Sequence, residues 1–205
     1  MGCDLSRKLI DEVIEFHGHW CPGLAIGIRA GEWALREMGR AGDEEVAALT
    51  ETDMCACDAI QVLVGCTFGK GNLFHLDYGK PAFSFFRRSD GKSARLVFEP
   101  GDFLQEEENI LALLSRKMRE GVATAQDEED RRILRERRAR KIMEADFEQL
   151  YQVKEAGPMP AKARVLESLR CESCGETAME SRTHRLLGRT LCRPCFRAED
   201  SRGLG

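Results

Sequence analysis

The 205-residue sequence lacks any long apolar segment. No run reaches the roughly 18 apolar residues that a membrane helix needs, and the first residues, MGCDLSRKLIDEV, contain no apolar signal core. A dominant charge of one sign is also missing, because 31 basic and 35 acidic residues leave a net charge of -4. This balance gives no general attraction to nucleic acid or to an anionic membrane. We therefore expect a cytoplasmic protein that is not associated with a membrane.

Cysteine, in contrast, is abundant. In a reducing cytoplasm, metal ligation or thiol chemistry explains many thiols better than disulfides do, and an odd number fits poorly with a closed disulfide framework. The cysteines are therefore the first candidates for functional sites. The nine are Cys3, Cys21, Cys55, Cys57, Cys66, Cys171, Cys174, Cys192 and Cys195.

Three regions of the chain differ in composition. Residues 1–125 hold most of the mixed apolar patterns and predict an α+β core domain, with helices packed on an antiparallel-containing sheet. Residues 126–165 hold a highly charged stretch followed by a proline-containing linker. Residues 166–205 hold the last four cysteines and predict a small zinc-finger domain.

Within the core domain, helix and strand signals alternate. Ser6 and Pro22 mark the starts of two helices, because serine suits an N-cap and proline suits a first helical position. Residues 58–65 are either a helix or a buried strand, and Asp58 as an N-cap favours the helix. The other predicted elements are a strand at 46–51, a β-hairpin of 82–88 and 94–100 around the turn SDGK, and a helix at 102–119.

The segment 127–151 is predicted to form a long charged helix, since its acidic start and basic continuation complement the helix dipole. The favoured interpretation is a solvated helix that packs on one side or pairs in a homodimer. Contact with nucleic acid is the alternative, and the flanking acids weaken it. The basic residues concerned are Arg131, Arg132, Arg135, Arg137, Arg138, Arg140 and Lys141.

The most specific motif lies in the last region. Cys171 and Cys174 precede Cys192 and Cys195 in a pattern of C-x2-C, seventeen residues and C-x2-C, which is typical of a structural zinc site in a zinc ribbon or treble clef. Four thiolates fill every tetrahedral position, so this zinc is expected to be structural. Metal binding would also supply the folding free energy that so short a domain lacks. A redox pair at CRPC is the less favoured alternative.

Zinc modules of this kind bind proteins, nucleic acids or other parts of their own chain. A protein partner is a hypothesis for this region, and nucleic acid is a weaker one that rests on local positive charge. The arginines are Arg170, Arg182, Arg185, Arg189, Arg193 and Arg197.

Three segments of the first domain carry a family resemblance: FHGHWCPGLAIGIRAG (16–31), ETDMCACDAIQVLVGCTFGKGNL (51–73) and DYGKPAFSFFRR (77–88). Together they resemble the E-subunit family of formylmethanofuran dehydrogenase over roughly residues 5–155. The resemblance implies an α+β core, commonly dimeric, with a Cys/His crevice that can hold a metal, but no settled reaction. Any molybdopterin activity would belong to a partner. The family motif falls on His17, His19, Cys21, Cys55, Cys66 and Lys70.

The same residues make chemical sense as a core site, because imidazole and thiolate are ligands for zinc, nickel or iron. His17 and Cys21 are four apart, so a helical turn would place them on one side, and His19 joins them only if the chain breaks at Gly18. Cys55 precedes a helix, which predicts a lowered pKa for its thiol. The candidate metal ligands are His17, His19, Cys21, Cys55 and Cys66, and the candidate catalytic residues are Cys21, Cys55, His19 and Lys70.

Alternatives to this core site stay open. The histidines could be hydrogen-bonded residues at a helix end and the thiols could be packed in the core. Cys57 stands where the family has a small apolar residue, so it is either a spare thiol or an added ligand. The loop GCTFGKGN (65–72) is not a phosphate loop, because its glycine spacing is wrong and no Ser or Thr follows Lys70. Its backbone could still face an anion, with Lys70 as counter-charge.

These observations support two functional hypotheses. One is an enzyme, or an accessory component of an enzyme, in one-carbon or redox metabolism, with the Cys/His site in the core. The other is a metal- or redox-sensing regulatory module whose zinc finger binds a protein or nucleic acid.

Overall fold

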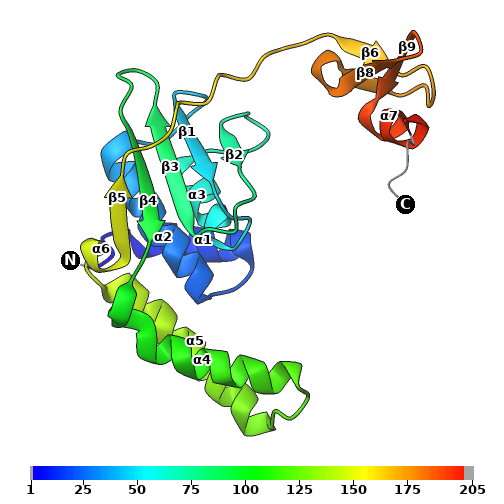
Figure 1. The fold of residues 1–205 in the computed structure, drawn as a ribbon. Helices are drawn as coiled ribbons and strands as arrows, with labels where there is room; N and C mark the ends of the chain where they lie inside the picture. Colours follow the sequence, from blue (N-terminus) through cyan, green and yellow to red (C-terminus); the bar gives the residue numbers. More distant parts are fainter. Residues whose placement is uncertain (1, 201–205) are drawn as a thin grey trace. The chain divides into compact units, whose positions relative to one another are not determined.

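The computed structural model describes residues 2–200, which form two compact units (Figure 1). The first, here called the core unit, ends at Lys162, and the second, the tail unit, begins at Ala163. The predicted α+β class is confirmed for the core unit. Among residues 2–200, every helix is too short or too polar to cross a lipid bilayer.

A five-stranded sheet in the order β2-β1-β3-β4-β5 forms the centre of the core unit. Strands β1 and β2 run parallel, and every other neighbouring pair is antiparallel. The predicted strand at 46–51 and the predicted hairpin are confirmed as β1, β3 and β4, whereas β2 and β5 were not expected. The strands are β1 (Val46–Thr50), β2 (Leu73–His75), β3 (Ala82–Arg87), β4 (Ser93–Phe98) and β5 (Tyr151–Lys154).

Three helices, α1 (Arg7–His17), α2 (Pro22–Met38) and α3 (Ala56–Val64), pack together on one face of this sheet (Figure 1). The oxygen of Ser6 accepts a hydrogen bond from the N–H of Leu9 at 3.4 Å, so Ser6 is the predicted N-cap of α1. Pro22 opens α2 as expected. The segment at 58–65 is a helix, but it begins earlier than predicted, with Cys55 at the N-cap and Asp58 in the first turn.

A row of glycines on α2 brings α3 unusually close. A Cβ at Gly27 would lie 2.3 Å from the carbonyl oxygen of Ala56, and one at Gly31 would lie 2.8 Å from a methyl group of Leu63. Residues four apart lie on one face of a helix, so these glycines form a continuous contact surface. The contact places the start of α3 beside the start of α2.

The charged region belongs to the core unit. Composition, in contrast, predicted a core domain that ends at residue 125. The 3-10 turn η1 (Gly101–Leu104) leads into α4 (Gln105–Arg119), and α5 (Ala125–Glu144) returns antiparallel to it (Figure 1). Ala139 and Ile142 of α5 are fully buried in the main core. The chain then forms α6 (Phe147–Leu150) and enters the sheet as β5. The predicted helix at 127–151 therefore ends at Glu144.

Arg29 fixes α5 to α2. Its side chain is 1% exposed, and its guanidinium donates hydrogen bonds to the carbonyl oxygens of Ile142, Met143 and Ala145 at 3.2, 2.9 and 2.7 Å. The last carbonyls of a helix have no partner within the helix, and a cation there also complements the helix dipole. Arg29 of α2 therefore holds the carboxyl end of α5 in place.

The tail unit consists of two short hairpins and a terminal helix. Leu187 and Gly188 both have positive φ at the tight turn of the second hairpin. The buried apolar cluster of the described tail residues contains only Cys171, Leu191 and Cys192. Residues 201–205 of the predicted zinc-finger domain lie outside the described residues. The elements are β6 (Ser168–Arg170), β7 (Thr177–Met179), η2 (Glu180–Arg182), β8 (Thr183–Leu186), β9 (Arg189–Cys192) and α7 (Arg193–Glu199).

Candidate metal centres

The tail unit brings its four cysteines together. The sulfur atoms of Cys171, Cys174, Cys192 and Cys195 all lie within 4.8 Å of one another. Backbone N–H groups, first that of Cys192 at 3.3 Å from the sulfur, lower the pKa of the Cys171 thiol to about 6. Four converging sulfurs of which one is readily ionised are the donor set of a structural zinc ion.

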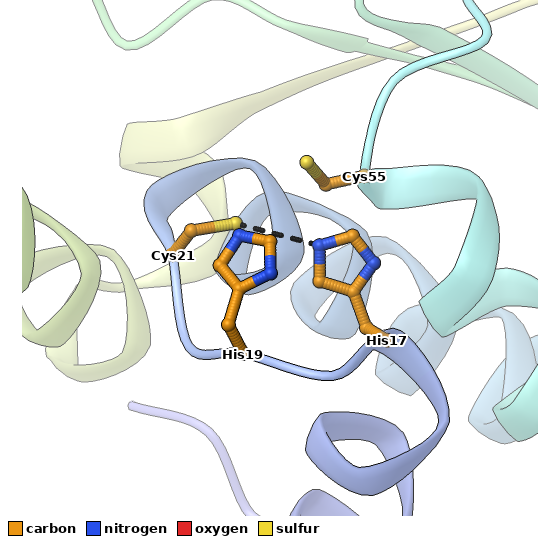
Figure 2. Close-up of side chains that lie close together, drawn as sticks. All are labelled: His17, His19, Cys21 and Cys55. Atoms are coloured by element: carbon orange, nitrogen blue, oxygen red, sulfur yellow. Dashed lines mark hydrogen bonds between the residues drawn. The ribbon is translucent and has the colours of Figure 1, made fainter.

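A second group lies in the core unit (Figure 2). One ligand atom from each of His17, His19, Cys21 and Cys55 lies within 4.8 Å of the others. Nε2 of His17 is 3.9 Å from Sγ of Cys21, and the two imidazole rings are 4.4 Å apart between centroids. The structure therefore gathers four of the five core ligand candidates around one point.

Local structure explains how residues 17–21 turn toward that point. Gly18 adopts φ 88° and its N–H bonds to the carbonyl of Ile14 at 2.8 Å, which ends α1 with a left-handed residue. The chain reverses there, so the side chains of His17 and His19 both face Cys21 (Figure 2). Cys21 is the N-cap of α2, and its sulfur accepts the N–H of Leu24 at 3.3 Å.

Cys55 comes from a distant part of the sequence. It is the N-cap of α3, and the α2–α3 contact brings it to Cys21. A Cβ at Gly23 would lie 3.2 Å from Cβ and 3.4 Å from Sγ of Cys55. Gly23 thus continues the contact surface of Gly27 and Gly31 and leaves room for the Cys55 thiol.

Asp58 orients His17. Oδ2 of Asp58 is 2.7 Å from Nδ1 of His17, and Oδ1 accepts a hydrogen bond from Gln61 at 3.1 Å. A carboxylate on one imidazole nitrogen fixes the tautomer and leaves the other nitrogen as a ligand atom. From the sequence, Asp58 was expected only as a helix cap. Its position three residues after Cys55 on a helix was the available signal.

The pKa of Cys55 differs from the expectation. Burial first, and then the neighbouring Cys21 thiol, raises the pKa of the Cys55 thiol, whereas the helix start was predicted to lower it. The reason is local, because the Cys55 side chain makes no capping hydrogen bond with α3. The metal-free thiol is therefore protonated at neutral pH, and a bound cation would favour its thiolate.

Cys66 and Lys70 do not belong to this group, although the family motif falls on them. Cys66 is fully buried, its thiol donates to the carbonyl of Val46 at 3.5 Å, and burial raises its pKa to about 12. Lys70 donates to the carbonyl of Ala41 at 3.4 Å. Cys57 also stays outside, with its thiol 3.0 Å from the carbonyl of Thr52. Each of these three side chains donates to a backbone carbonyl instead.

Two adjoining cavities reach the core group. The thiol cavity, of about 200 Å³, is lined by Cys21, Cys55, Leu111, Arg131, Arg135 and Arg138, with four further residues. The histidine cavity, of about 450 Å³, is lined by His19, Trp20, Glu128, Arg131, Arg132 and Arg135, with Glu136. Helix α5 supplies every arginine of both cavities.

Residues 16–152 match the family described as FmdE, molybdenum formylmethanofuran dehydrogenase operon. The chain belongs to the FmdE family. Residues 166–200 match the prokaryotic dksA/traR C4-type zinc finger, which contains all four tail cysteines. The protein is therefore a metal-binding member of the FmdE family with a C-terminal zinc finger, and zinc in the tail is structural.

Two relatives are similar to this FmdE-family chain. One from Archaeoglobus fulgidus, described as a probable S-adenosyl-L-methionine-binding protein, is 33% identical over 193 residues, which is 87% of this chain. The chain spans about half the length of that relative. A tungsten formylmethanofuran dehydrogenase FmdE-like protein from Syntrophus aciditrophicus has the same fold, with a TM-score of 0.61, 20% identity and full coverage of both chains.

Proposed function

We propose that the core unit is a metal-dependent enzyme or a component of one. His17, Cys21 and Cys55 would hold one transition-metal ion, and His19 would be a replaceable fourth ligand. Imidazole and thiolate donors suit zinc, nickel or iron. The observation that carries the proposal is the convergence of these ligand atoms beside two cavities, because a catalytic metal site must admit substrate.

The core unit does not depend on this ion for its fold. A continuous apolar core, with Leu24, Ile28, Phe83 and Phe85 fully buried, already joins its helices to its sheet. Burial of each such side chain contributes about 1.5–3 kcal/mol. The tail residues that the structure describes, up to Asp200, bury no such core, so the tail unit is expected to need its zinc. This contrast supports a functional role for a core ion.

The four core residues divide into fixed and replaceable ligands. Two thiolates and one imidazole are a donor set that catalytic zinc sites use, with the fourth position open. Asp58 fixes His17, and helix starts fix both cysteines, whereas the His19 side chain is exposed. A His19 released from the ion is placed to accept or donate a proton in the histidine cavity. When bound, the metal supplies Lewis-acid or redox chemistry.

The description of the FmdE family supports a place for this chain in one-carbon or redox metabolism. The family description names the operon of formylmethanofuran dehydrogenase, and the formyl group in that name is a one-carbon unit. The Cys/His group is compatible with such chemistry, because its donors suit both Lewis-acid and redox-active metals.

Metal stoichiometry tests the proposal. Elemental analysis of the full chain purified without added metal should give two metal ions per chain, one in each unit. Cys21→Ser and Cys55→Ser should each lose one equivalent, because they remove fixed ligands. His19→Ala should retain the core ion with weaker affinity, because a water molecule can take its place.

Cys57→Ser is the matched control, since Cys57 follows Cys55 by two residues and lies outside the group. It should retain both ions. One metal per chain in the wild type, unchanged in Cys21→Ser, would contradict the core centre.

Asp58→Asn should raise the dissociation constant of the core metal about 10- to 100-fold, because the neutral amide holds His17 less firmly in its ligand tautomer. The measurement is competition for cobalt(II) against a chromogenic chelator. The fold should persist, since the Asp58 side chain is 35% exposed. Asp53→Asn, at an exposed position in the preceding loop, is the control. Equal affinities for Asp58→Asn and wild type would remove Asp58 from the site.

A further inference from the structure

We propose that the thiol cavity binds an oxyanion, a carboxylate or phosphate group, between Arg131, Arg135 and Arg138 and beside the core metal position. This inference rests on the proposed function and deepens it, because it names the chemical class of the ligand. The arginines line the cavity together with Cys21 and Cys55.

The charge of the cavity is one-sided. Three guanidinium groups line it, and within residues 2–200 no carboxylate does. Arginine remains charged at all physiological pH values, so these groups cannot relieve their repulsion by losing protons. Two thiolates and a divalent ion would cancel in formal charge. The positive charge of the three arginines would therefore remain beside a metal-loaded site.

The three arginines that line the thiol cavity have few hydrogen-bond acceptors in the protein. Nε of Arg131 and Nε of Arg138 are buried, and neither finds a hydrogen-bond acceptor among the described residues. Arg138, 14% exposed, has Glu108 at 3.6 Å, which is a long contact for an ion pair. Arg131 and Arg135 make no hydrogen bond or ion pair within residues 2–200. Arg131 and Arg135 therefore have no carboxylate among those residues to balance their charge, and a bound anion would supply one.

The other three arginines of α5 each have a carboxylate partner close by. The lack of acceptors is therefore confined to the side of the helix that faces the thiols. The pairs are Arg132 with Glu129 at 2.6 Å, Arg137 with Glu107 at 3.2 Å and Arg140 with Glu136 at 2.6 Å.

Guanidinium geometry selects the class of ligand. Its parallel N–H groups match the paired oxygens of a carboxylate or phosphate. A volume of about 200 Å³ is below the roughly 300–1,000 Å³ of pockets for drug-sized molecules. The cavity therefore suits a small acid or the acidic end of a larger molecule. The shared Arg131 and Arg135 connect it to the histidine cavity, where the rest of such a molecule would lie.

Titration of the full chain with sodium acetate, inorganic phosphate and neutral acetamide tests the inference. Isothermal titration calorimetry should be run on metal-free and on cobalt(II)-loaded protein, and the loaded samples should also be followed by visible absorption. We expect saturable binding of acetate or phosphate and none of acetamide. Comparison of the two anions decides between a carboxylate and a phosphate site. Binding of the anion should shift the cobalt bands, because the cavity adjoins both thiols.

Arg135→Gln should raise the dissociation constant of the anion at least about 10-fold, since it removes a charged hydrogen-bond donor. Arg135→Lys should recover part of the affinity. Arg140→Gln, five residues later, paired with Glu136 and outside both cavities, should bind as the wild type does. Far-ultraviolet circular dichroism verifies the fold of each variant. Because Arg135 is only half-buried, its replacement is expected to leave the fold intact.

The outcomes separate the two proposals. Anion binding to a chain that holds no core metal supports the oxyanion site and contradicts the metal centre. Two metal ions per chain without acetate or phosphate binding overturn the oxyanion site alone. It is also overturned if acetamide binds as well as acetate, or if Arg140→Gln weakens binding as much as Arg135→Gln. In those cases the arginines serve only to stabilise the neighbouring thiolates.

Discussion

Replacement of Cys192 with serine should unfold the tail unit while the core unit stays folded. The described tail residues bury an apolar cluster of only Cys171, Leu191 and Cys192, so apolar burial supplies a few kcal/mol at most. Structural zinc supplies about 10–16 kcal/mol in zinc-finger peptides. The serine removes one of four converging ligands and with it most of that free energy.

Heteronuclear NMR of the full chain is the measurement for Cys192→Ser. Amide resonances of residues 163–200 should collapse to random-coil positions, and those of the core unit should keep their dispersion. Ser173→Ala, at an exposed position between two ligands, is the control and should leave the spectrum dispersed. Dispersed tail resonances in Cys192→Ser would show that the tail folds without a complete zinc site.

Gly27→Ala should both destabilise the core unit and remove its metal. The new methyl group would lie 2.3 Å from the carbonyl oxygen and 2.5 Å from the Cα of Ala56. Backbone atoms cannot rotate away, so α2 and α3 must separate. Overpacking typically costs about 1–3 kcal/mol, and we expect the upper end. The separation also moves Cys55 away from Cys21.

Urea unfolding and metal analysis of the same samples measure both effects of Gly27→Ala. Gly69→Ala is the control, because a Cβ at Gly69 meets no atom within 4 Å. It should retain the wild-type stability and the core metal. A Gly27→Ala protein that keeps both the wild-type stability and its metal would contradict the close contact between the two helices. A stable variant that loses only its metal would mean that the contact serves Cys55 alone.

The parts of the fold that local sequence determines were predictable. Ser6, Pro22 and the turn SDGK act within a few residues of themselves, and the elements that they begin or join are present. Strand β5 and the core position of α5 were not predicted. The four residues of β5 gain their partner only from β4, and α5 buries mainly small or scattered side chains under a highly charged exterior.

The candidate site divides in the same way. The spacing of His17, His19 and Cys21 indicated one group, because a single turn holds all three. Cys55 joins them through a contact between two helices, which the sequence alone does not reveal. Cys66 seemed equivalent to Cys55 in sequence, but it follows the far end of α3 and points into the core. The role of Asp58 likewise depends on the packing of α1 against α3.

The Arg29 contact also sets how far each arginine of α5 would be displaced if the helix tilted about its fixed end. It holds α5 near Ile142, close to one end of the helix. This helix has 20 residues and is about 30 Å long. Arg138 lies about 6 Å along the axis from that fixed point and Arg131 about 16 Å. A tilt of about 10° would therefore displace Arg138 by about 1 Å and Arg131 by about 3 Å. Arg138 would stay close to its position beside the thiols, while Arg131 could move to contact ligands of different length.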